Sequence, residues 1–196
     1  MSEISFIFLQ DLKCLKVNYN EVKRYLKING CTEALDEIML ECEKEVYKFA
    51  SPKAVYLETR FEAYDSTMDF CFGTVKSENL SKNLYGCKKA YIFCATLGAE
   101  IDRLIKRYSQ IEPSKALIID SISSALVESF CDYINDYMGK EKSLCPRFSC
   151  GYGDFSISHQ GAILNVLDAS RKIGVSLMES HMMTPSKTVT AIVGIK

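Results

Sequence analysis

The sequence has little of what metal sites and hydrolase active sites are usually built from. Its 196 residues contain no tryptophan, and His159 and His181 are the only histidines. Neither histidine has a serine, aspartate or cysteine partner at a spacing typical of nucleophilic catalysis, so a catalytic triad is not indicated. The nine cysteines are scattered and form no C-x-x-C pair, which argues against a zinc or iron–sulfur site. We therefore predict no catalytic and no metal-binding residue.

An excess of one charge and long apolar runs are missing as well. Lys and Arg (24) nearly balance Asp and Glu (25), and no basic run occurs, so nothing points to nucleic acid or an anionic membrane as a partner. No apolar run reaches the ~18 residues that a membrane-spanning helix needs. The N-terminal stretch has acids, not basic residues, before its short apolar run, which argues against a signal peptide. We expect a soluble cytoplasmic protein with reduced thiols.

Both helical and strand-like patterns are present. Apolar residues at helical spacing predict helices over residues 18–29, 33–50, 99–110, 115–138 and 161–174. Gly30 is expected to end the first helix, Thr32 to cap the second and Ser114 to cap the long fourth one. β-Branched and aromatic residues predict strands over residues 53–63, 66–75, 88–98, 175–180 and 187–195, with a hairpin turn around residues 63–66. This mixture favours one α+β domain over residues 1–196, whose first 50 residues are a helical addition.

Glycine, with only 10 residues in the chain, gathers in one unusual stretch, CPRFSCGYGDFSISHQG (145–161). One interpretation is a Gly-rich turn whose arginine forms an ion pair and whose aspartate caps the next helix. The other is a binding site in which the fork of Arg147 pairs with a carboxylate or phosphate. In that case the backbone at Ser149 and Gly151 is open to a ligand, and Tyr152 supplies a flat apolar surface. The residues alone favour neither interpretation.

Three segments together decide between them. R-F-S-C-G-Y-G-D (147–154) resembles the arginine-x-small-x-Gly-Tyr element in the activation domain of cobalamin-dependent methionine synthase, which binds S-adenosylmethionine. L-V-E-S-F-C-D-Y (126–133) is similar to a helical segment of that domain that carries a ligand-binding glutamate. E-S (179–180) followed by M-T-P-S-K-T-V-T (183–190) is similar to its Ser…Met-x-Pro-x-x-Ser-Val-Ser strand. The segments occur in the family's order, within residues 88–196.

The resemblance implies a fold and a set of contacts. The fold would be a twisted, mainly antiparallel sheet with flanking helices. Arg147 would hold the methionyl carboxylate of S-adenosylmethionine, and Glu128 would accept hydrogen bonds from its ammonium or ribose hydroxyls. Backbone groups of Ser149 and Gly151 would recognise the adenosyl part, and Tyr152 would lie beside the corrin ring of cobalamin supplied by a partner. The polar flank of the long helix, Ser121, Ser124 and Glu128, would face a cleft.

By this resemblance the chain would be a free-standing reactivation protein for methionine biosynthesis. Its partners would be a cobalamin-dependent methionine synthase that lacks this domain and an external reductant such as flavodoxin. Two alternatives stay open. The same fold could serve another corrinoid methyltransferase or another small ligand, or the chain could be a thiol or metal protein that uses Cys145 and Cys150.

Overall fold

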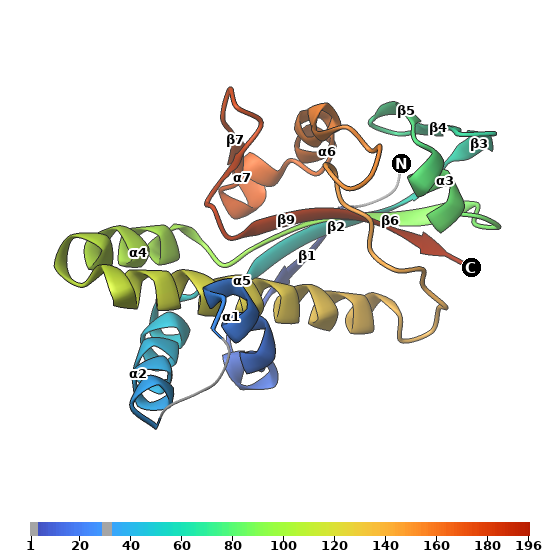
Figure 1. Cartoon of the computed structure of the whole chain (residues 1–196). Coiled ribbons are helices and arrows are strands. Elements are labelled where there is room, and N and C mark those ends of the chain that lie inside the picture. The colour runs from blue at the N-terminus through green and yellow to red at the C-terminus, as the bar shows by residue number, and fades with distance from the viewer. Residues whose placement is uncertain (1–3, 29–32) are drawn as a thin grey trace.

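A four-stranded antiparallel sheet divides the helices into two layers in the computed structural model, which describes residues 4–28 and 33–196 (Figure 1). The strand order across the sheet is β1 (Ser5–Phe8), β2 (Lys53–Arg60), β6 (Lys89–Thr96) and β9 (Thr188–Ile195). All three pairings are antiparallel. The predicted α+β class with a mainly antiparallel sheet is confirmed.

The central strand β6 explains why both faces of the sheet are covered. All of its eight residues except Lys89 are buried. Side chains alternate between the two faces of a strand, so Phe93 packs into one core and Ile92 and Cys94 into the other. A strand that is apolar at consecutive positions can be stable only between two layers.

Four helices cover one face of the sheet and form the lower layer of Figure 1. They are α1 (Tyr19–Leu26), α2 (Glu33–Phe49), α4 (Ala99–Ile111) and α5 (Pro113–Met138). The apolar stripe predicted for α5 is buried from Ile118 to Phe130, whereas Tyr137, predicted to lie in the core, is 43% exposed. The predicted cap at Ser114 is wrong, because Glu112 occupies the N-cap and Pro113 the first helical turn.

The opposite face carries short elements only. The predicted hairpin turn is confirmed: β3 (Glu62–Tyr64) pairs with β4 (Thr67–Phe70) around Asp65, and β5 (Gly73–Lys76) completes a small separate sheet. The remaining elements are α3 (Glu78–Asn83), η2 (Ile157–His159), α6 (Gln160–Val166), α7 (Ala169–Ile173), β7 (Ser176–Leu177) and β8 (Met183–Thr184).

Several predicted boundaries are corrected. The helix expected over 161–174 is divided into α6 and α7, because Asp168 adopts a left-handed conformation (φ 51°) between them. The strand expected over 175–180 is only two residues long. The first 50 residues are not a purely helical addition, since they also contain the 3₁₀ turn η1 (Leu12–Cys14) and the edge strand β1. The predicted ends at Gly30 and Thr32 lie outside the described residues.

Among the described residues, none of the helices is both long enough and apolar enough to cross a membrane.

Candidate ligand-binding cleft

A cleft of about 650 Å³ opens between α5, the segment that joins α5 to α6, and the first half of β9. Its size falls in the range of small-molecule sites, about 300–1,000 Å³. The lining residues are Glu128, Asp132, Asn135, Pro146, Arg147, Phe148, Ser149, Cys150, Tyr152, Ile157, Gln160, His181, Met182, Met183, Ser186, Thr188, Val189 and Thr190. All three segments that carry the family resemblance therefore contribute to one cavity.

The segment after α5 is held against the free edge of β9. Phe148 and Ile192 exchange two backbone hydrogen bonds of 2.9 Å each, and the N–H of Cys145 donates to the carbonyl of Gly194 at 2.9 Å. Residues 144–148 thus extend the sheet by a short irregular pairing. This pairing places Arg147 opposite α5.

Asp154 ties the Gly-rich loop to α3. Its carboxylate accepts hydrogen bonds from Ser77 Oγ (2.5 Å) and from the N–H groups of Glu78 (2.7 Å) and Asn79 (3.2 Å). The Ser77 hydrogen bond, helped by these N–H groups and opposed by desolvation, lowers the pKa of Asp154 to about 2. The expected aspartate cap therefore exists, but it caps α3, which lies more than 70 residues upstream in the sequence.

The opposite wall is fixed equally well. Lys187, just before β9, pairs with Asp120 of α5 (2.7 Å) and donates to Ser124 Oγ (2.9 Å). The backbone N–H and hydroxyl of Ser186 both donate to the carboxylate of Asp102 in α4, at 2.9 and 2.5 Å. The three lining segments are thus held by contacts to regular elements, which is the arrangement expected of a preorganised site.

Arg147 forms the polar centre of the cleft. Its Nη1 donates to Asp132 Oδ1 at 2.6 Å and its Nη2 to Glu128 Oε2 at 3.0 Å, while its side chain is 20% exposed. Desolvation opposes the charged form, but Cys131 and the Asp132 and Glu128 carboxylates outweigh it, so the pKa of Arg147 is raised. A guanidinium has five N–H donors, and these two contacts leave others for a ligand.

The predicted site residues are mostly brought together. Glu128, Arg147, Ser149 and Tyr152 line the cleft, and Tyr152, which is 67% exposed, stands at its rim. Gly151 is not among the lining residues. The N–H of Gly151 donates to the carbonyl of Phe155 at 2.8 Å, in a turn where the φ of Gly151 is +87°. Because this N–H already has a partner, Gly151 could contact a ligand only through its carbonyl oxygen.

The three residues of the predicted polar flank of α5 have different surroundings. Glu128 lines the cleft, whereas the hydroxyls of Ser121 and Ser124 donate to backbone carbonyls one turn back, both at 2.9 Å. Small hydroxyl side chains in a helix commonly satisfy themselves in this way. The expectation that all three face the cleft is therefore wrong for Ser121 and Ser124, neither of which lines it, and Ser121 is also buried.

Sequence reasoning missed Asp132, the second partner of Arg147. Asp132 follows Glu128 by four residues and so shares its helix face, which is the one pattern that could have identified it. His181 and Met182 also line the cleft from the turn between β7 and β8. No local pattern indicates this, because only the folded chain brings that turn to α5.

Among residues 4–28 and 33–196, no group of three or more His, Cys, Asp or Glu side chains is arranged to hold a metal ion.

Comparison with known proteins gives a structural match without a sequence match. No protein-family model matches the chain, and no curated protein matches its sequence. Thirteen solved chains are similar in structure. One is the MetH reactivation domain bound to AdoHcy, with a TM-score of 0.77 and 12% sequence identity, over 98% of this chain and 78% of that one. At this identity the match establishes the fold, which is that of the MetH reactivation domain.

Proposed function

We propose that this protein binds S-adenosylmethionine in the cleft beside Arg147 and supports reactivation of a separate cobalamin-dependent methionine synthase. One observation carries the proposal: the three segments that resemble the methionine synthase activation domain, far apart in the sequence, line a single cavity of suitable size. The chain also shares its fold with a reactivation domain that was crystallised with AdoHcy.

The charges of the cleft suit this ligand. Two carboxylates, Glu128 and Asp132, surround one guanidinium, Arg147, which leaves one net negative charge in the cluster. S-adenosylmethionine carries a sulfonium, an ammonium and a carboxylate, and hence one net positive charge, whereas AdoHcy is neutral overall. In a partly desolvated cleft, opposite charges a few ångströms apart attract more strongly than they do in water. The cluster therefore favours the methyl donor over its demethylated product.

Each predicted contact has a group in place to make it. The free N–H donors of Arg147 would hold the methionyl carboxylate, a charge-assisted interaction that suits the planar guanidinium fork. Glu128 accepts only one hydrogen bond from Arg147 here, so its remaining lone pairs would receive the ammonium or ribose hydroxyls. The backbone of Ser149 and the carbonyl of Gly151 would contact the adenosyl part.

The proposed role needs no general base in this chain. When bound, S-adenosylmethionine supplies a methyl group to the partner's cobalamin after a reductant such as flavodoxin has returned an electron. The residues of this chain bind and orient the methyl donor, which is how a protein contributes to cofactor chemistry. Tyr152 stands exposed at the rim of the cleft, where it would lie beside the corrin ring. The reaction would take place in the cytoplasm.

Isothermal titration calorimetry tests the binding step. The purified chain is titrated with S-adenosylmethionine, first alone and then with a cobalamin-loaded methionine synthase that lacks its activation domain. Saturable heat under either condition supports the proposal, and heat only with the partner means that the interface completes the site. No heat under both conditions would refute it.

Reactivation is tested separately by following the return of activity of the oxidised synthase with reductant and S-adenosylmethionine. Dependence of this return on the chain is expected, together with a loss in Tyr152→Ala that persists at S-adenosylmethionine concentrations that saturate the variant. Ligand binding with no effect on the synthase would contradict the role and leave a module that serves another corrinoid methyltransferase.

A further inference from the structure

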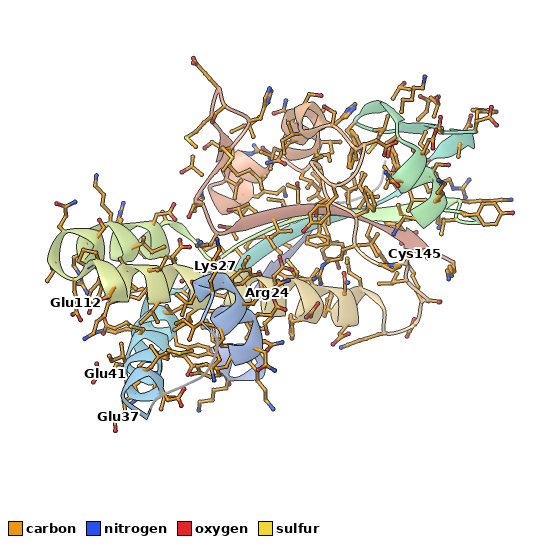
Figure 2. All side chains as sticks on the ribbon, viewed as in Figure 1. Arg24, Lys27, Glu37, Glu41, Glu112 and Cys145 are labelled. Carbon is orange, nitrogen blue, oxygen red and sulfur yellow. The ribbon has the colours of Figure 1, made fainter. Side chains whose placement is uncertain are left out.

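Two cysteines from distant parts of the chain lie in contact beside the cleft. The Sγ atoms of Cys87 and Cys145 are 3.5 Å apart, although the residues are separated by 58 positions in the sequence. Cys87 lies in the turn between α3 and β6, and Cys145 lies in the segment that pairs with β9. Figure 2 labels Cys145 near the C-terminal end of β9.

A glycine makes room for the two sulfur atoms. A Cβ placed on Gly194 would lie 2.8 Å from Cys87 Sγ and 3.1 Å from Cys145 Sγ. The first distance is shorter than real Cβ atoms show, and the second is tighter than most Cβ contacts. Leu84 Cδ2 lies 2.9 Å from the same position, so the two thiols and this methyl group occupy the space that any other residue at position 194 would fill. Because Gly194 pairs with Ala90 in β6 and accepts a hydrogen bond from Cys145, the register of the sheet brings the thiols together.

Cys87 is the more accessible of the two thiols. Cys87 is half-buried, and Cys145, although only 5% exposed, lines a surface groove of about 460 Å³ together with Pro146 and Lys142. Desolvation and the neighbouring Cys145 thiol raise the pKa of Cys87 to about 11. Attack by a thiolate is correspondingly slow at neutral pH and faster in mild base.

We propose that Cys87 and Cys145 form a reversible disulfide that responds to low-molecular-weight disulfides. The thiolate of Cys87 attacks one sulfur of the reagent, forms a mixed disulfide and expels one thiolate. The Cys145 thiolate then attacks Cys87 Sγ and expels the second. The two protein thiols lose two electrons and two protons, and the reagent disulfide gains both as it becomes two thiols.

The disulfide would act on the segment that carries Arg147. Its formation must draw the sulfur atoms from 3.5 Å to the S–S bond length of about 2.05 Å. Cys145 precedes Arg147 by two residues, and the intervening Pro146 accepts a hydrogen bond from Asn83 Nδ2 at 3.2 Å. The bond therefore adds a covalent link to a segment that is otherwise held by hydrogen bonds, at the edge of the cleft.

The test uses the full chain, oxidised glutathione at about pH 8 and peptide mapping after alkylation. The expected product is one intramolecular crosslink between the peptides of Cys87 and Cys145, two hydrogens lighter than the reduced pair. Cys145→Ser should leave Cys87 as a glutathione adduct, because the second thiol is missing. Cys71→Ser, which removes an exposed thiol, should leave the crosslink unchanged.

Two results would overturn the proposal. One is a persistent glutathione adduct at Cys87 in the wild-type chain, which would show that Cys145 cannot displace it. The other is full alkylation of both thiols under conditions that modify Cys71. Neither readout involves S-adenosylmethionine, so failure here leaves the proposed function untouched, and failure of ligand binding leaves the disulfide untouched.

Discussion

Replacement of Arg147 by alanine should separate ligand binding from stability. The guanidinium is mostly buried, with its side chain 20% exposed, and among the described residues that line the cleft it is the only Lys or Arg side chain. Loss of a partly buried, charge-assisted contact to a ligand carboxylate costs roughly 2–5 kcal/mol. Because some water reaches Arg147, we take about 3 kcal/mol, which corresponds to a rise in Kd of about a hundredfold.

The effect on folding should be much smaller. Removing Arg147 leaves two carboxylates without their partner, but the side chains of Glu128 and Asp132 are 49% and 70% exposed and stay hydrated. Ion pairs of this exposure contribute about 0–1 kcal/mol. For a chain of this length that is a decrease in Tm of about 2–4 °C or less.

Calorimetric titration with S-adenosylmethionine and thermal unfolding check both expectations on the same samples. The matched control is Arg171→Ala, which removes a guanidinium whose side chain is 84% exposed and pairs with Asp168 outside the cleft. The control should bind like the wild type. If Arg147→Ala folds normally and binds within a factor of about two of the wild type, which is under 0.5 kcal/mol, Arg147 does not hold the ligand and our assignment of the cleft is wrong.

Three further substitutions test the charge, the loop anchor and the core. Asp132→Asn removes a negative charge from the cleft and should weaken S-adenosylmethionine more than neutral AdoHcy, by roughly tenfold in the ratio of Kd values; an unchanged ratio would contradict the charge argument. Asp154 has its pKa lowered from 3.8 to about 2, so its contribution to stability is complete above about pH 4 and is lost as the pH falls to about 2. In urea unfolding between pH 6 and 2, the free energy of unfolding should therefore decrease less with falling pH for Asp154→Asn than for the wild type or for the exposed control Asp136→Asn. Identical pH dependence in all three would exclude the capping role. Gly194→Ala forces a methyl group to 2.8 Å from a cysteine sulfur and should cost about 1–3 kcal/mol by urea unfolding, and a neutral result would show that the thiols move aside freely.

Local sequence patterns were sufficient for most elements of the fold. The helical spacing in residues 99–110 and 115–138 predicts α4 and α5, and the apolar runs predict β2, β6 and β9. These predictions succeed because the spacing of apolar residues shows which side of a helix or strand is buried, and long elements must bury one side against the core. They fail where an element is short or interrupted. The left-handed Asp168 that divides α6 from α7 and the four-residue strand β1 have no strong pattern.

The residues of the cleft divide in the same way. The types and order of the three family-like segments pointed to Glu128, Arg147, Ser149 and Tyr152, which do line one cavity. Asp132 could have been predicted as well, because it follows Glu128 by four residues on the same helix. The hydrogen bond from the Gly151 N–H to the Phe155 carbonyl could not have been predicted, because it depends on the turn that brings these two residues together.

By itself, then, the sequence determined the class of fold and the positions of its long elements, because these follow from burial patterns along the chain. The resemblance of three segments to a known family, and not the residue types alone, pointed to the residues of the cleft. Only the tertiary structure decided the pairing of Arg147 with two carboxylates, the capping of α3 by Asp154 and the contact between Cys87 and Cys145. Those contacts join residues between 15 and 77 positions apart. Their partners are set by sheet register and helix packing, which no local pattern encodes.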